Sequence, residues 1–560
     1  MRFAAPALLA VLVAVALPSS SVAHGSNTLR EIVCISDSRF NHDADCETAK
    51  GIGSAAFLAV SPDGKFVYVT GRETDSIAAF ARDRRTGRLK QLPGAAACIT
   101  DVSSAHDPDC ADGTALNRAS GLVVTPDGRF LYVASVLGDS VAIFQRNLKT
   151  GALTETGCVA EALAGCSKGK GMRGAIYPVV SPDGHNLYLA SGTSNSGTSN
   201  AVAVFNRDGS TGALTELGCL TDAKSSDPDC VKTAGLNGAS SLAVSADGRN
   251  VYVSATGSSA VTAFSRNVTT GGLSALGCIS GDSGYRQDPA CTGGIGLQFV
   301  QFVSVTADGK NVYVGATDSH TIAGFARSPA NGALTQLPPP DGCVKDFDNG
   351  DNPCRPGFGL SLPLAVIPSP DGKFVYTGSF GYGTVASFKR DPATGSLAQF
   401  GPCISEEDSR CDRGKGLRRA GFLALSPDGR NVYANAPTSS AVVVFGRSQT
   451  PFPPAIAGNR GKIVKRKAVR LRLRCSALAE TGCIGKISIV GRGSAKRLKL
   501  GPVTFDIRSG GSKLITLRPK GRAKKKLLRR LKRFTARALV ITTEPGGEVE
   551  RTSPIVKVSR

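Results

Sequence analysis

Seven copies of a short Ser/Thr-x-Asp-Gly motif run along the chain, and the residues eight positions before them form a largely polar series. If the seven units surround a common axis, this series lies at one end of that axis. It reads Gly53, Asn117, Arg173, Asn237, Gln298, Ser361 and Arg418, and the next position adds Arg118 and Arg419. Converging amide, hydroxyl and guanidinium groups can bind a carboxylate or a phosphate. We therefore predict a site for a small anionic ligand; the alternative is a solvated rim without a specific ligand.

Groups for nucleophilic or acid–base catalysis do not coincide with this series. The sequence shows no Gly-x-Ser-x-Gly motif at a strand-to-helix turn. Its histidines are His24, His42, His106, His185 and His320, and all five fall outside the series. The sequence therefore leaves open whether the protein is an enzyme.

Acidic residues gather in several loops and could provide oxygen ligands for Ca²⁺. They are Asp43, Asp45, Asp107, Asp109, Asp227, Asp229, Asp346, Asp348 and Asp351. Their spacing does not match an EF-hand, which requires a central Gly and a distal Glu. Asp before Cys is also a good turn former, and His42-Asp43 and His106-Asp107 indicate a transition metal only weakly. We predict turns here, with no metal and no cofactor.

The sixteen cysteines form eight close pairs in the sequence. The pairs are Cys34/Cys46, Cys98/Cys110, Cys158/Cys166, Cys219/Cys230, Cys278/Cys291, Cys343/Cys354, Cys403/Cys411 and Cys475/Cys483. Local disulfides in an oxidising compartment are the simplest interpretation, although the sequence does not fix the pairing. Zinc is the alternative, but a second closely spaced ligand pair is missing.

The N-terminus has the features of a secretory signal. Arg2 precedes an apolar run from Ala4 to Leu17, and small residues lead to Ala23. We predict a signal peptide over residues 1–23, cleaved after Ala23, and an extracytoplasmic protein. An uncleaved anchor is the alternative. Beyond residue 23 no apolar run reaches the roughly 18–20 residues of a membrane span, which excludes a polytopic membrane protein.

The motif copies lie 56 to 64 residues apart and extend into Val-Tyr or Leu-Tyr. They are 61–68, 125–132, 181–188, 245–252, 306–313, 369–376 and 426–433. Each unit reads as four short strands, with the Asp-Gly turn between the first two. Four-stranded units repeated in a ring predict an all-β, seven-bladed β-propeller; a solenoid is the alternative.

The last unit lacks a fourth strand, because Thr450-Pro-Phe-Pro-Pro454 follows its third strand directly. The segment 28–34, ending at Cys34, resembles the fourth strand that ends at Cys219. We predict that residues 28–34 complete the seventh blade and close the ring, which gives a propeller over residues 28–448.

Together with Thr150-Gly-Ala-Leu153 and Thr211-Gly-Ala-Leu214, the Ser-Pro-Asp-Gly-x-x-Val-Tyr repeats resemble those of lactonase-type seven-bladed propellers. That family includes 6-phosphogluconolactonase and a muconate cyclase. The resemblance implies the propeller fold and, as an activity, hydrolysis or formation of a lactone. The Cys loops depart from the plain cytoplasmic members. As fourth-to-first connections, each with one bridge, they share one face of such a ring, where we expect the ligand.

The C-terminal region is different in charge. Residues 451–560 contain 29 Lys and Arg against 5 Asp and Glu, whereas the rest of the chain is close to neutral. We predict a linker over 449–461 and a small basic β-sandwich over 462–560, with one amphipathic helix over 522–533. The helix packs on the sandwich or, alternatively, lies on a membrane surface.

The predicted partner of this basic domain is an anionic cell-wall polymer or an anionic membrane surface. Nucleic acid is not expected, because no base-reading motif is present and the chain is predicted to be exported. We expect a monomer. Two function classes remain: a secreted binding or scaffold propeller of the cell envelope, which we favour, and a secreted lactonase or lactonising enzyme acting at the channel mouth.

Overall fold

The structure is a computed structural model. It describes residues 29–447 except 41–42, 104–108, 195–196, 226, 282–286 and 348–352, and residues 455–559 except 465–466, 476–482, 493–494, 496, 509–510, 520, 522–527, 529, 544–548 and 553–554. The predicted signal peptide and most of the predicted linker lie outside the described residues. No helix among the described residues is long and apolar enough to cross a membrane.

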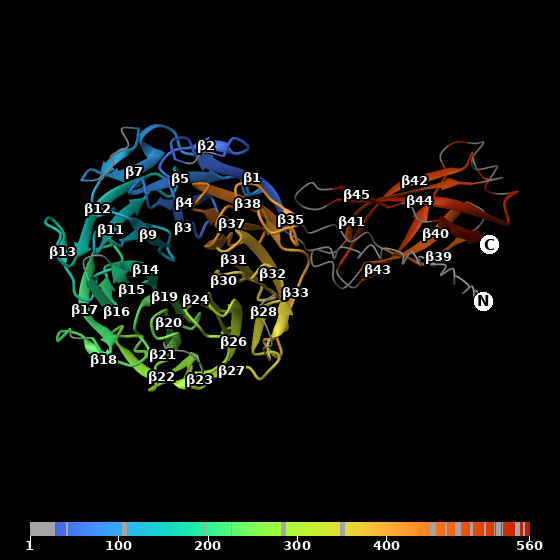
Figure 1. Cartoon of the computed structure of the whole chain (residues 1–560). Coiled ribbons are helices and arrows are strands. Elements are labelled where there is room, and N and C mark those ends of the chain that lie inside the picture. Colours follow the sequence, from blue (N-terminus) through green and yellow to red (C-terminus); the bar gives the residue numbers. More distant parts are fainter. Residues whose placement is uncertain are drawn as a thin grey trace, which may run out of the picture.

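Seven β-sheets surround a central axis and form a seven-bladed propeller (Figure 1). Blade 1 comprises β3 (Ala55–Val60), β4 (Phe66–Gly71), β5 (Ser76–Arg82), β6 (Leu89–Gln91), β7 (Cys98–Asp101) and β8 (Ala111–Gly113). Blade 2 comprises β9 (Ala119–Val124), β10 (Phe130–Ser135), β11 (Ser140–Arg146), β12 (Leu153–Ala160) and β13 (Ser167–Lys168). Blade 3 comprises β14 (Ala175–Val180), β15 (Asn186–Ser194), β16 (Gly197–Arg207), β17 (Leu214–Asp222) and β18 (Val231–Thr233), and blade 4 comprises β19 (Ala239–Val244), β20 (Asn250–Ala255), β21 (Ala260–Arg266), β22 (Leu273–Gly281) and β23 (Thr292–Gly294). A 3₁₀ turn, η1 (Gly94–Ala96), precedes β7.

Blades 5 to 7 repeat the pattern. Blade 5 comprises β24 (Val300–Val305), β25 (Asn311–Ala316), β26 (Thr321–Arg327), β27 (Leu334–Gln336), β28 (Cys343–Asp346) and β29 (Arg355–Gly357). Blade 6 comprises β30 (Pro363–Pro368), β31 (Phe374–Ser379), β32 (Thr384–Arg390), β33 (Leu397–Gln399), β34 (Ile404–Ser405) and β35 (Asp412–Arg413). Blade 7 comprises β36 (Leu423–Leu425), β37 (Asn431–Ala436), β38 (Ala441–Arg447), β1 (Leu29–Asp37) and β2 (Glu47–Ala49). The propeller prediction is confirmed.

The ring closes through the N-terminal strand. β1 pairs antiparallel with β38, with Leu29 opposite Arg447 and Ser36 opposite Ala441. The seventh blade therefore takes its outer strand from the opposite end of the propeller sequence, as predicted. This pairing joins the first and last blades without leaving a free edge on β38.

The cysteines pair as their spacing predicts, and none of the sixteen is a free thiol. The bridges are Cys34–Cys46, Cys98–Cys110, Cys158–Cys166, Cys219–Cys230, Cys278–Cys291, Cys343–Cys354, Cys403–Cys411 and Cys475–Cys483. Every bridge joins sequence neighbours, so the local pairing is confirmed and the zinc alternative is wrong. Eight disulfides also indicate an oxidising, extracytoplasmic compartment.

The position of the second cysteine corrects the prediction that the bridges lie in the connections between blades. In the propeller this cysteine directly precedes an unpredicted fifth strand of its own blade. The seven cases are Cys46 before β2, Cys110 before β8, Cys166 before β13, Cys230 before β18, Cys291 before β23, Cys354 before β29 and Cys411 before β35. Each stapled loop is therefore internal to a blade, and the connection to the next blade begins only after the fifth strand.

The bridge explains why such a short fifth strand can form. The strand has two or three residues and pairs parallel with the outer strand, as β8 does with β7. In the seven propeller bridges the Cα atoms of the two cysteines lie 4.7–4.8 Å apart. This distance equals the spacing of paired strands, so the bridge holds the start of the fifth strand at the distance from the outer strand that pairing requires.

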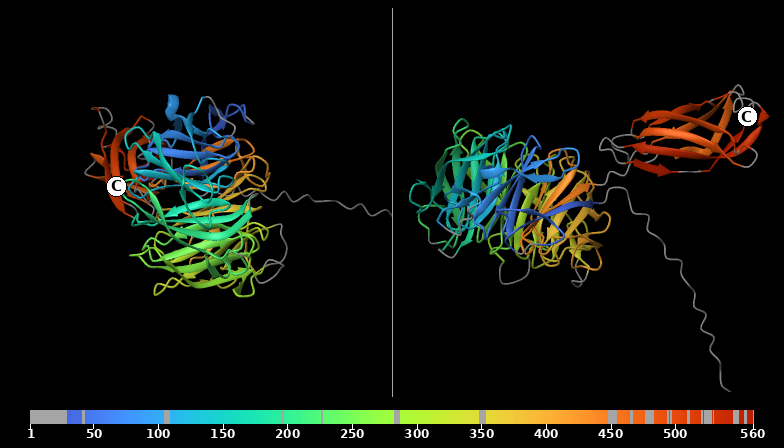
Figure 2. Two further views of the ribbon diagram at one scale, coloured as in Figure 1. Left: turned by 90° about the vertical axis from the view of Figure 1, so that its left-hand side faces the viewer. Right: turned by 90° about the horizontal axis from the view of Figure 1, so that it is seen from above.

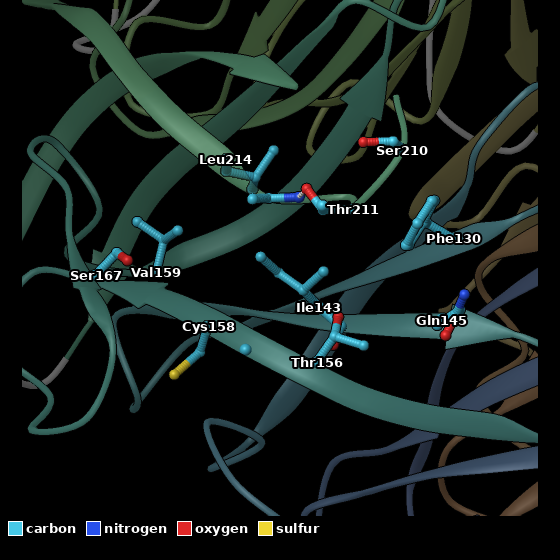
Figure 3. Close-up of a pocket in the computed structure, with 12 residues that line it drawn as sticks. Phe130, Ile143, Gln145, Thr156, Cys158, Val159, Ser167, Ser210, Thr211 and Leu214 are labelled. Carbon is cyan, nitrogen blue, oxygen red and sulfur yellow. Dashed lines mark hydrogen bonds between the residues drawn. The ribbon is translucent and has the colours of Figure 1, made fainter. Parts of the chain in front are cut away.

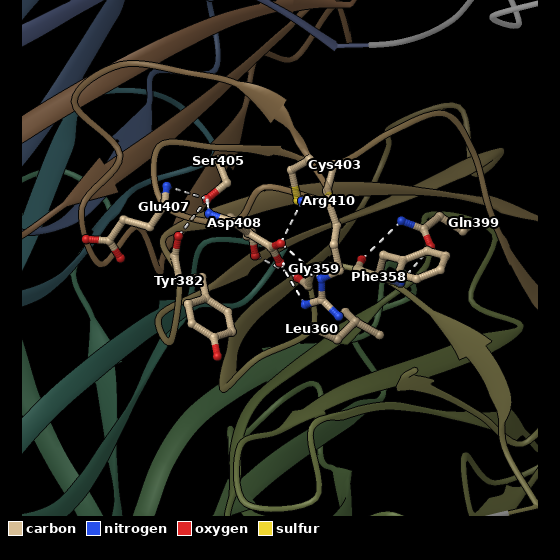
Figure 4. Close-up of a disulfide and its surroundings, with 12 residues drawn as sticks. Phe358, Gly359, Leu360, Tyr382, Gln399, Cys403, Ser405, Glu407, Asp408 and Arg410 are labelled. Carbon is tan, nitrogen blue, oxygen red and sulfur yellow. Dashed lines mark hydrogen bonds and ion pairs between the residues drawn. A yellow bond between two sulfur atoms is a disulfide. The ribbon is translucent and has the colours of Figure 1, made fainter. Parts of the chain in front are cut away.

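The stapled loop of blade 6 shows how little freedom such a loop has (Figure 4). Beside the Cys403–Cys411 bridge, Arg410 pairs with Asp408 at 2.7 Å and with Asp346 at 3.3 Å. Its guanidinium also lies 5.9 Å from the ring centroid of Phe358. The loop is thus held by a covalent bond, two ion pairs and an aromatic contact.

The repeated Asp-Gly-x-x-Val-Tyr motif joins neighbouring blades. Arg266, at the end of the third strand of blade 4, donates to Tyr188 Oη at 2.7 Å and pairs with Asp183 at 2.8 Å. The Tyr188 hydroxyl donates to the Gly271 carbonyl of the next blade at 2.8 Å. Burial alone would raise the pKa of Asp183, but hydrogen bonds from Ser181, from the His185 N–H and from Arg266 keep this pKa below its usual range.

The same Arg–Asp pair recurs at every blade junction. The pairs are Arg82–Asp428, Arg146–Asp63, Arg207–Asp127, Arg266–Asp183, Arg327–Asp247, Arg390–Asp308 and Arg447–Asp371. In each of them the arginine side chain is almost fully buried and the aspartate is partly exposed. We call this arrangement the inter-blade clamp. Its position, at the Asp-Gly turns, leaves the other face of the ring to the stapled loops.

The remaining strands build a C-terminal β-domain outside the ring (Figure 2). They are β39 (Ala455–Val464), β40 (Ala468–Arg474), β41 (Cys483–Gly491), β42 (Lys499–Ile507), β43 (Ser512–Leu517), β44 (Arg533–Thr543), β45 (Val549–Thr552) and β46 (Ile555–Ser559). The predicted β-domain is confirmed, but strand structure begins at Ala455, inside the predicted linker. Most of the predicted helix lies outside the described residues, and Arg533 already starts β44.

Candidate functional site at the channel mouth

The predicted polar series lies where it was expected, directly before the innermost strands. Arg118, Arg173, Asn237, Arg418 and Arg419 are exposed, while Asn117, Gln298 and Ser361 are half-buried. Because all seven inner strands start at the same end of the ring, these residues surround the mouth of the central channel, on the face of the stapled loops.

The position after each member of the series has a left-handed backbone in all seven blades. These residues are Ser54, Arg118, Gly174, Gly238, Phe299, Leu362 and Arg419, with φ between 51° and 75°. Only two of them are glycine, although L-residues rarely adopt this conformation. The strain of five such residues indicates that the surrounding structure holds the mouth in one shape.

Hydrogen bonds from the preceding blade hold this backbone. The N–H of each of six left-handed residues donates to a side chain of the neighbouring blade; five of the acceptors lie in the turn between its second and third strands, and the sixth, Asn200, lies in β16. The pairs are Arg118 to Asp75 (2.5 Å), Gly174 to Asp139 (2.7 Å), Gly238 to Asn200 (2.8 Å), Phe299 to Ser259 (3.1 Å), Leu362 to His320 Nδ1 (3.2 Å) and Ser54 to Ser440 (2.9 Å). His320 is therefore a structural acceptor in this ring of contacts.

Two of the predicted arginines are paired with glutamates. Arg173 Nε lies 2.9 Å from Glu161, and Arg418 Nε lies 3.1 Å from Glu406. Each glutamate also accepts a backbone N–H, from Met172 in one case and from Leu417 in the other. Since their charges are already balanced, these two arginines contribute less to anion binding than the sequence suggested.

A different arginine provides unbalanced charge. Arg72 directly follows β4, and its Nη2 donates to Ser120 Oγ at 2.8 Å, while its buried Nε has no acceptor among the described residues. Burial and the nearby Arg118 lower the pKa of Arg72 to about 10. Both side chains carry a guanidinium group, and in the described part of the chain no carboxylate forms an ion pair with either. This pair of cations is poised to accept an anion.

Arg72 lines a small cavity of about 90 Å³ at the mouth. The other lining residues are Ser54, Ala56, Leu364, Phe380, Gly421, Phe422, Asn435 and Pro437. The guanidinium carbon of Arg419 lies 4.9 Å from the Phe380 ring centroid, which places a further cation beside the cavity wall. The cavity has room for one carboxylate or phosphate group but not for a whole sugar.

Four aromatic rings, from blades 1, 3, 5 and 7, pack against one another beneath the mouth. The centroid of Phe57 lies 3.9 Å from that of Phe422 and 5.5 Å from that of Tyr177, and Phe302 lies 5.5 Å from Tyr177 and 6.1 Å from Phe422. Burial raises the pKa of Tyr177 to about 12, so its hydroxyl stays neutral. The rings thus pack against one another below the cavity, which Phe422 also lines.

Another hollow lies between blades 2 and 3, at the outer strands (Figure 3). Its volume is about 400 Å³, and Phe130, Ile143, Thr156, Ser167 and Leu214 are among its lining residues. The residues that line it include no titratable side chain apart from Cys158, and Cys158 is in a disulfide. It offers no group for acid–base chemistry, in contrast to the charged mouth.

Metal binding finds no support in the part of the chain that the structure describes. No group of three His, Cys, Asp or Glu side chains there could hold a metal ion. His42, His106, Asp107, Asp348 and Asp351, which belong to the predicted acidic loops, lie outside the described residues. Asp109 instead pairs with Lys50 at 2.8 Å.

Sequence reasoning missed Arg72, Phe380 and the two glutamates of the mouth. Arg72 and Phe380 lie directly after second strands, at β4 and β31. The equivalent residues elsewhere in the ring vary in type, so no repeat pattern marks them. A search of the residues after each Val-Tyr strand, rather than before each inner strand, would have found both.

Comparisons with known proteins agree with the fold. The model of the family "Lactonase, 7-bladed beta-propeller" matches residues 37–98, 93–233 and 168–341, more than half of the chain. The 6-phosphogluconolactonase of Formosa agariphila is 30% identical over 101 residues, 18% of this chain and 24% of that protein. The one of Bacillus subtilis is 29% identical over 160 residues, 29% of this chain and 39% of that protein. The matches thus span less than half of the length of either relative.

Among solved structures, the periplasmic gluconolactonase of Pseudomonas aeruginosa is 21% identical, with a TM-score of 0.44, and the match covers 63% of this chain and 86% of that one. The repeats, the seven blades and the family match over residues 37–341 lead to one conclusion. The chain belongs to the lactonase family of seven-bladed β-propellers.

Proposed function

We propose that this protein is an extracytoplasmic binding protein that takes up the carboxylate or phosphate group of a small ligand at the channel mouth. The observation that carries the proposal is the pair Arg72 and Arg118. Burial and mutual repulsion lower the pKa of Arg72 to about 10 without neutralising it at physiological pH. An anion in the cavity would relieve both effects and supply the acceptor that Arg72 Nε lacks.

The shape of the mouth supports recognition of one end of the ligand. The anionic group fits the cavity of about 90 Å³, and the remainder would lie among the polar residues of the rim, including Asn117, Asn237 and Gln298. Backbone geometry fixed by inter-blade hydrogen bonds makes this rim preorganised, which reduces the entropy lost on binding.

Lactone hydrolysis is the second candidate, because the chain belongs to the lactonase family and its curated relatives are 6-phosphogluconolactonases. Hydrolysis requires a base that activates water close to the bound carbonyl. The side chains that line the cavity include a guanidinium, a hydroxyl and an amide but no carboxylate or imidazole. Glu161 and Glu406 approach the rim, yet both are engaged by arginines. Binding therefore agrees better with the site than catalysis does.

The test is calorimetric titration with gluconate, 6-phosphogluconate and inorganic phosphate. We expect binding of at least one of them, and loss of that binding in Arg72→Met and Arg118→Met. Arg249→Met, an exposed arginine at an Asp-Gly turn on the opposite face, is the matched control and should bind normally.

A parallel assay follows the hydrolysis of gluconolactone and 6-phosphogluconolactone above the spontaneous rate. Hydrolysis abolished in Arg72→Met would show the enzyme instead of the binding protein. Ligand affinity that is unchanged in both mouth variants would refute the proposed site.

A further inference from the structure

The C-terminal domain presents rows of cations on the outside of its sheet. In β40 the pattern alternates strictly: Val469, Leu471 and Leu473 are buried, while Arg470, Arg472 and Arg474 are exposed. Successive side chains of a strand point to opposite faces, so the three arginines form a file with a spacing of roughly 7 Å. In the sheet order β42-β41-β44-β46-β39-β40-β43, β46 joins β44 to β39 and β40, and in Figure 1 β39, β40 and β43 lie on the side of the domain opposite β42.

Strand register extends this file sideways. Arg470 is opposite Lys462 of β39, Lys462 is opposite Ser559 of β46, and Ser559 is opposite Arg533 of β44. Paired residues of neighbouring strands share a face, so this row carries three cations across four strands. Lys557 of β46 lies two residues from Ser559 and is exposed on the same face. We call the residues Arg470, Arg472, Arg474, Lys462, Lys557 and Arg533 the basic face.

Fold stability does not explain the basic face. Like charges directly opposite each other in a sheet are unfavourable, and Arg470 faces Lys462. Lysines protect exposed sheet edges, but β39 and β40 are interior strands of the sheet. Among the described residues of the domain no ion pair occurs, and the described acidic side chain, Asp506, is on β42. The positive charges of the basic face are therefore available to bind an anion from outside the protein.

We propose that the basic face binds a linear polymer that carries phosphate or carboxylate groups, and that it holds the propeller at such a polymer outside the cytoplasm. A file of three arginines along one strand matches a chain of repeating anionic groups laid along it. Ser559, Thr535 and Thr516 lie between the cations. Leu514, opposite Arg472, and Ile555, two residues from Lys557, are also exposed on this face, but the described residues place no aromatic wedge there for insertion into a bilayer. A polymer therefore fits the face better than a membrane does.

The test uses the full chain with its disulfides intact, and the probes are long-chain inorganic polyphosphate and polyglutamate. We expect both to bind at 50 mM salt and to be released progressively towards 200 mM. The variant Arg470→Gln/Arg472→Gln/Arg474→Gln should weaken binding by roughly tenfold or more, and it should reduce the slope of log affinity against log salt by about 2.

A matched control removes the same charge elsewhere in the domain. Lys486→Gln/Arg497→Gln/Lys499→Gln replaces three exposed cations of the β41–β42 region and should change affinity less than threefold. Equal weakening by the two triple variants would overturn the basic face, because net charge alone would then account for binding. Tighter binding to phosphatidylglycerol vesicles than to either polymer, or no binding to either polymer, would also overturn it.

Unchanged melting temperatures of both triple variants exclude unfolding as the cause. The proposal is independent of the ligand site in the propeller. Arg72→Met should bind the polymers as the unaltered protein does, so failure of one proposal leaves the other testable.

Discussion

Replacing Arg72 by methionine should make the unliganded propeller more stable while it abolishes ligand binding. Burial and the nearby Arg118 lower the Arg72 pKa to about 10, which corresponds to roughly 3 kcal/mol by which the folded state disfavours the charge. The substitution also removes the hydrogen bond to Ser120, worth about 1 kcal/mol. We therefore expect a gain of about 2 kcal/mol in the free energy of unfolding, in line with other buried charges replaced by apolar groups.

The assay is urea unfolding of the propeller, followed by tyrosine fluorescence because the chain has no tryptophan. The pH dependence adds a second check. The unfavourable charge is fully present below pH 10 and disappears as the folded protein releases the Arg72 proton above that pH. The advantage of Arg72→Met should therefore shrink between pH 9 and pH 11.

Arg249→Met, on an exposed side chain, should change the free energy of unfolding by less than about 0.5 kcal/mol. A loss of more than 1 kcal/mol in Arg72→Met would refute the reasoning, because Arg72 would then be a structural donor rather than a strained binding group. Equal stabilisation of the variant and the unaltered protein by a saturating anionic ligand would refute it as well.

Three further predictions concern the frame of the ring. Tyr188→Phe should destabilise the propeller by about 1–3 kcal/mol in chemical denaturation, because the buried Arg266 Nε loses its acceptor; an unchanged midpoint would contradict the inter-blade clamp. Burial lowers the pKa of His320 more than nearby carboxylates raise it, and its Nδ1 must stay unprotonated to accept from Leu362. Stability should therefore fall as the pH drops below about 6.5, and His320→Asn, which keeps an acceptor, should weaken that dependence in thermal melts at pH 5 and pH 8. Deletion of residues 24–36 should lower the melting temperature of the whole propeller, and a truncated protein that melts normally would disprove the shared seventh blade.

The fold was predictable because its sequence signals repeat. The Asp-Gly turn and the Val-Tyr strand recur in every unit, and the tyrosines of that strand reappear in the structure as buried groups such as Tyr68 and Tyr433. A second signal was visible but unused: each third strand ends in Phe-x-Arg, as in Phe264-Ser-Arg266. Seven copies of that tripeptide, one per unit, could have predicted the arginine partner of each Asp-Gly turn.

The candidate site was less predictable because it depends on single residues. Arg118 and Arg419 were found by counting back from the motif, but Arg72 occurs at a position without a repeated residue type. The glutamate partners of Arg173 and Arg418 both lie twelve residues before their arginines and three residues after the first cysteine of the blade, so this shared spacing was a visible signal that was not used. The short parallel fifth strands were also missed, since two or three residues without apolar alternation carry no strand signal.

The pairing of β1 with β38 also shapes how the chain must fold. The strand that begins at Leu29 can pair only after the strand that ends at Arg447, more than 400 residues later in the sequence, is in place. Contacts of such long range form late, because the loop between them must close first. Until then β38 exposes an unpaired edge, which is a template for a strand of another molecule. At high concentration, β1 of one copy could fill the seventh blade of its neighbour, so refolding yields should fall, and domain-swapped oligomers should accumulate, as protein concentration rises.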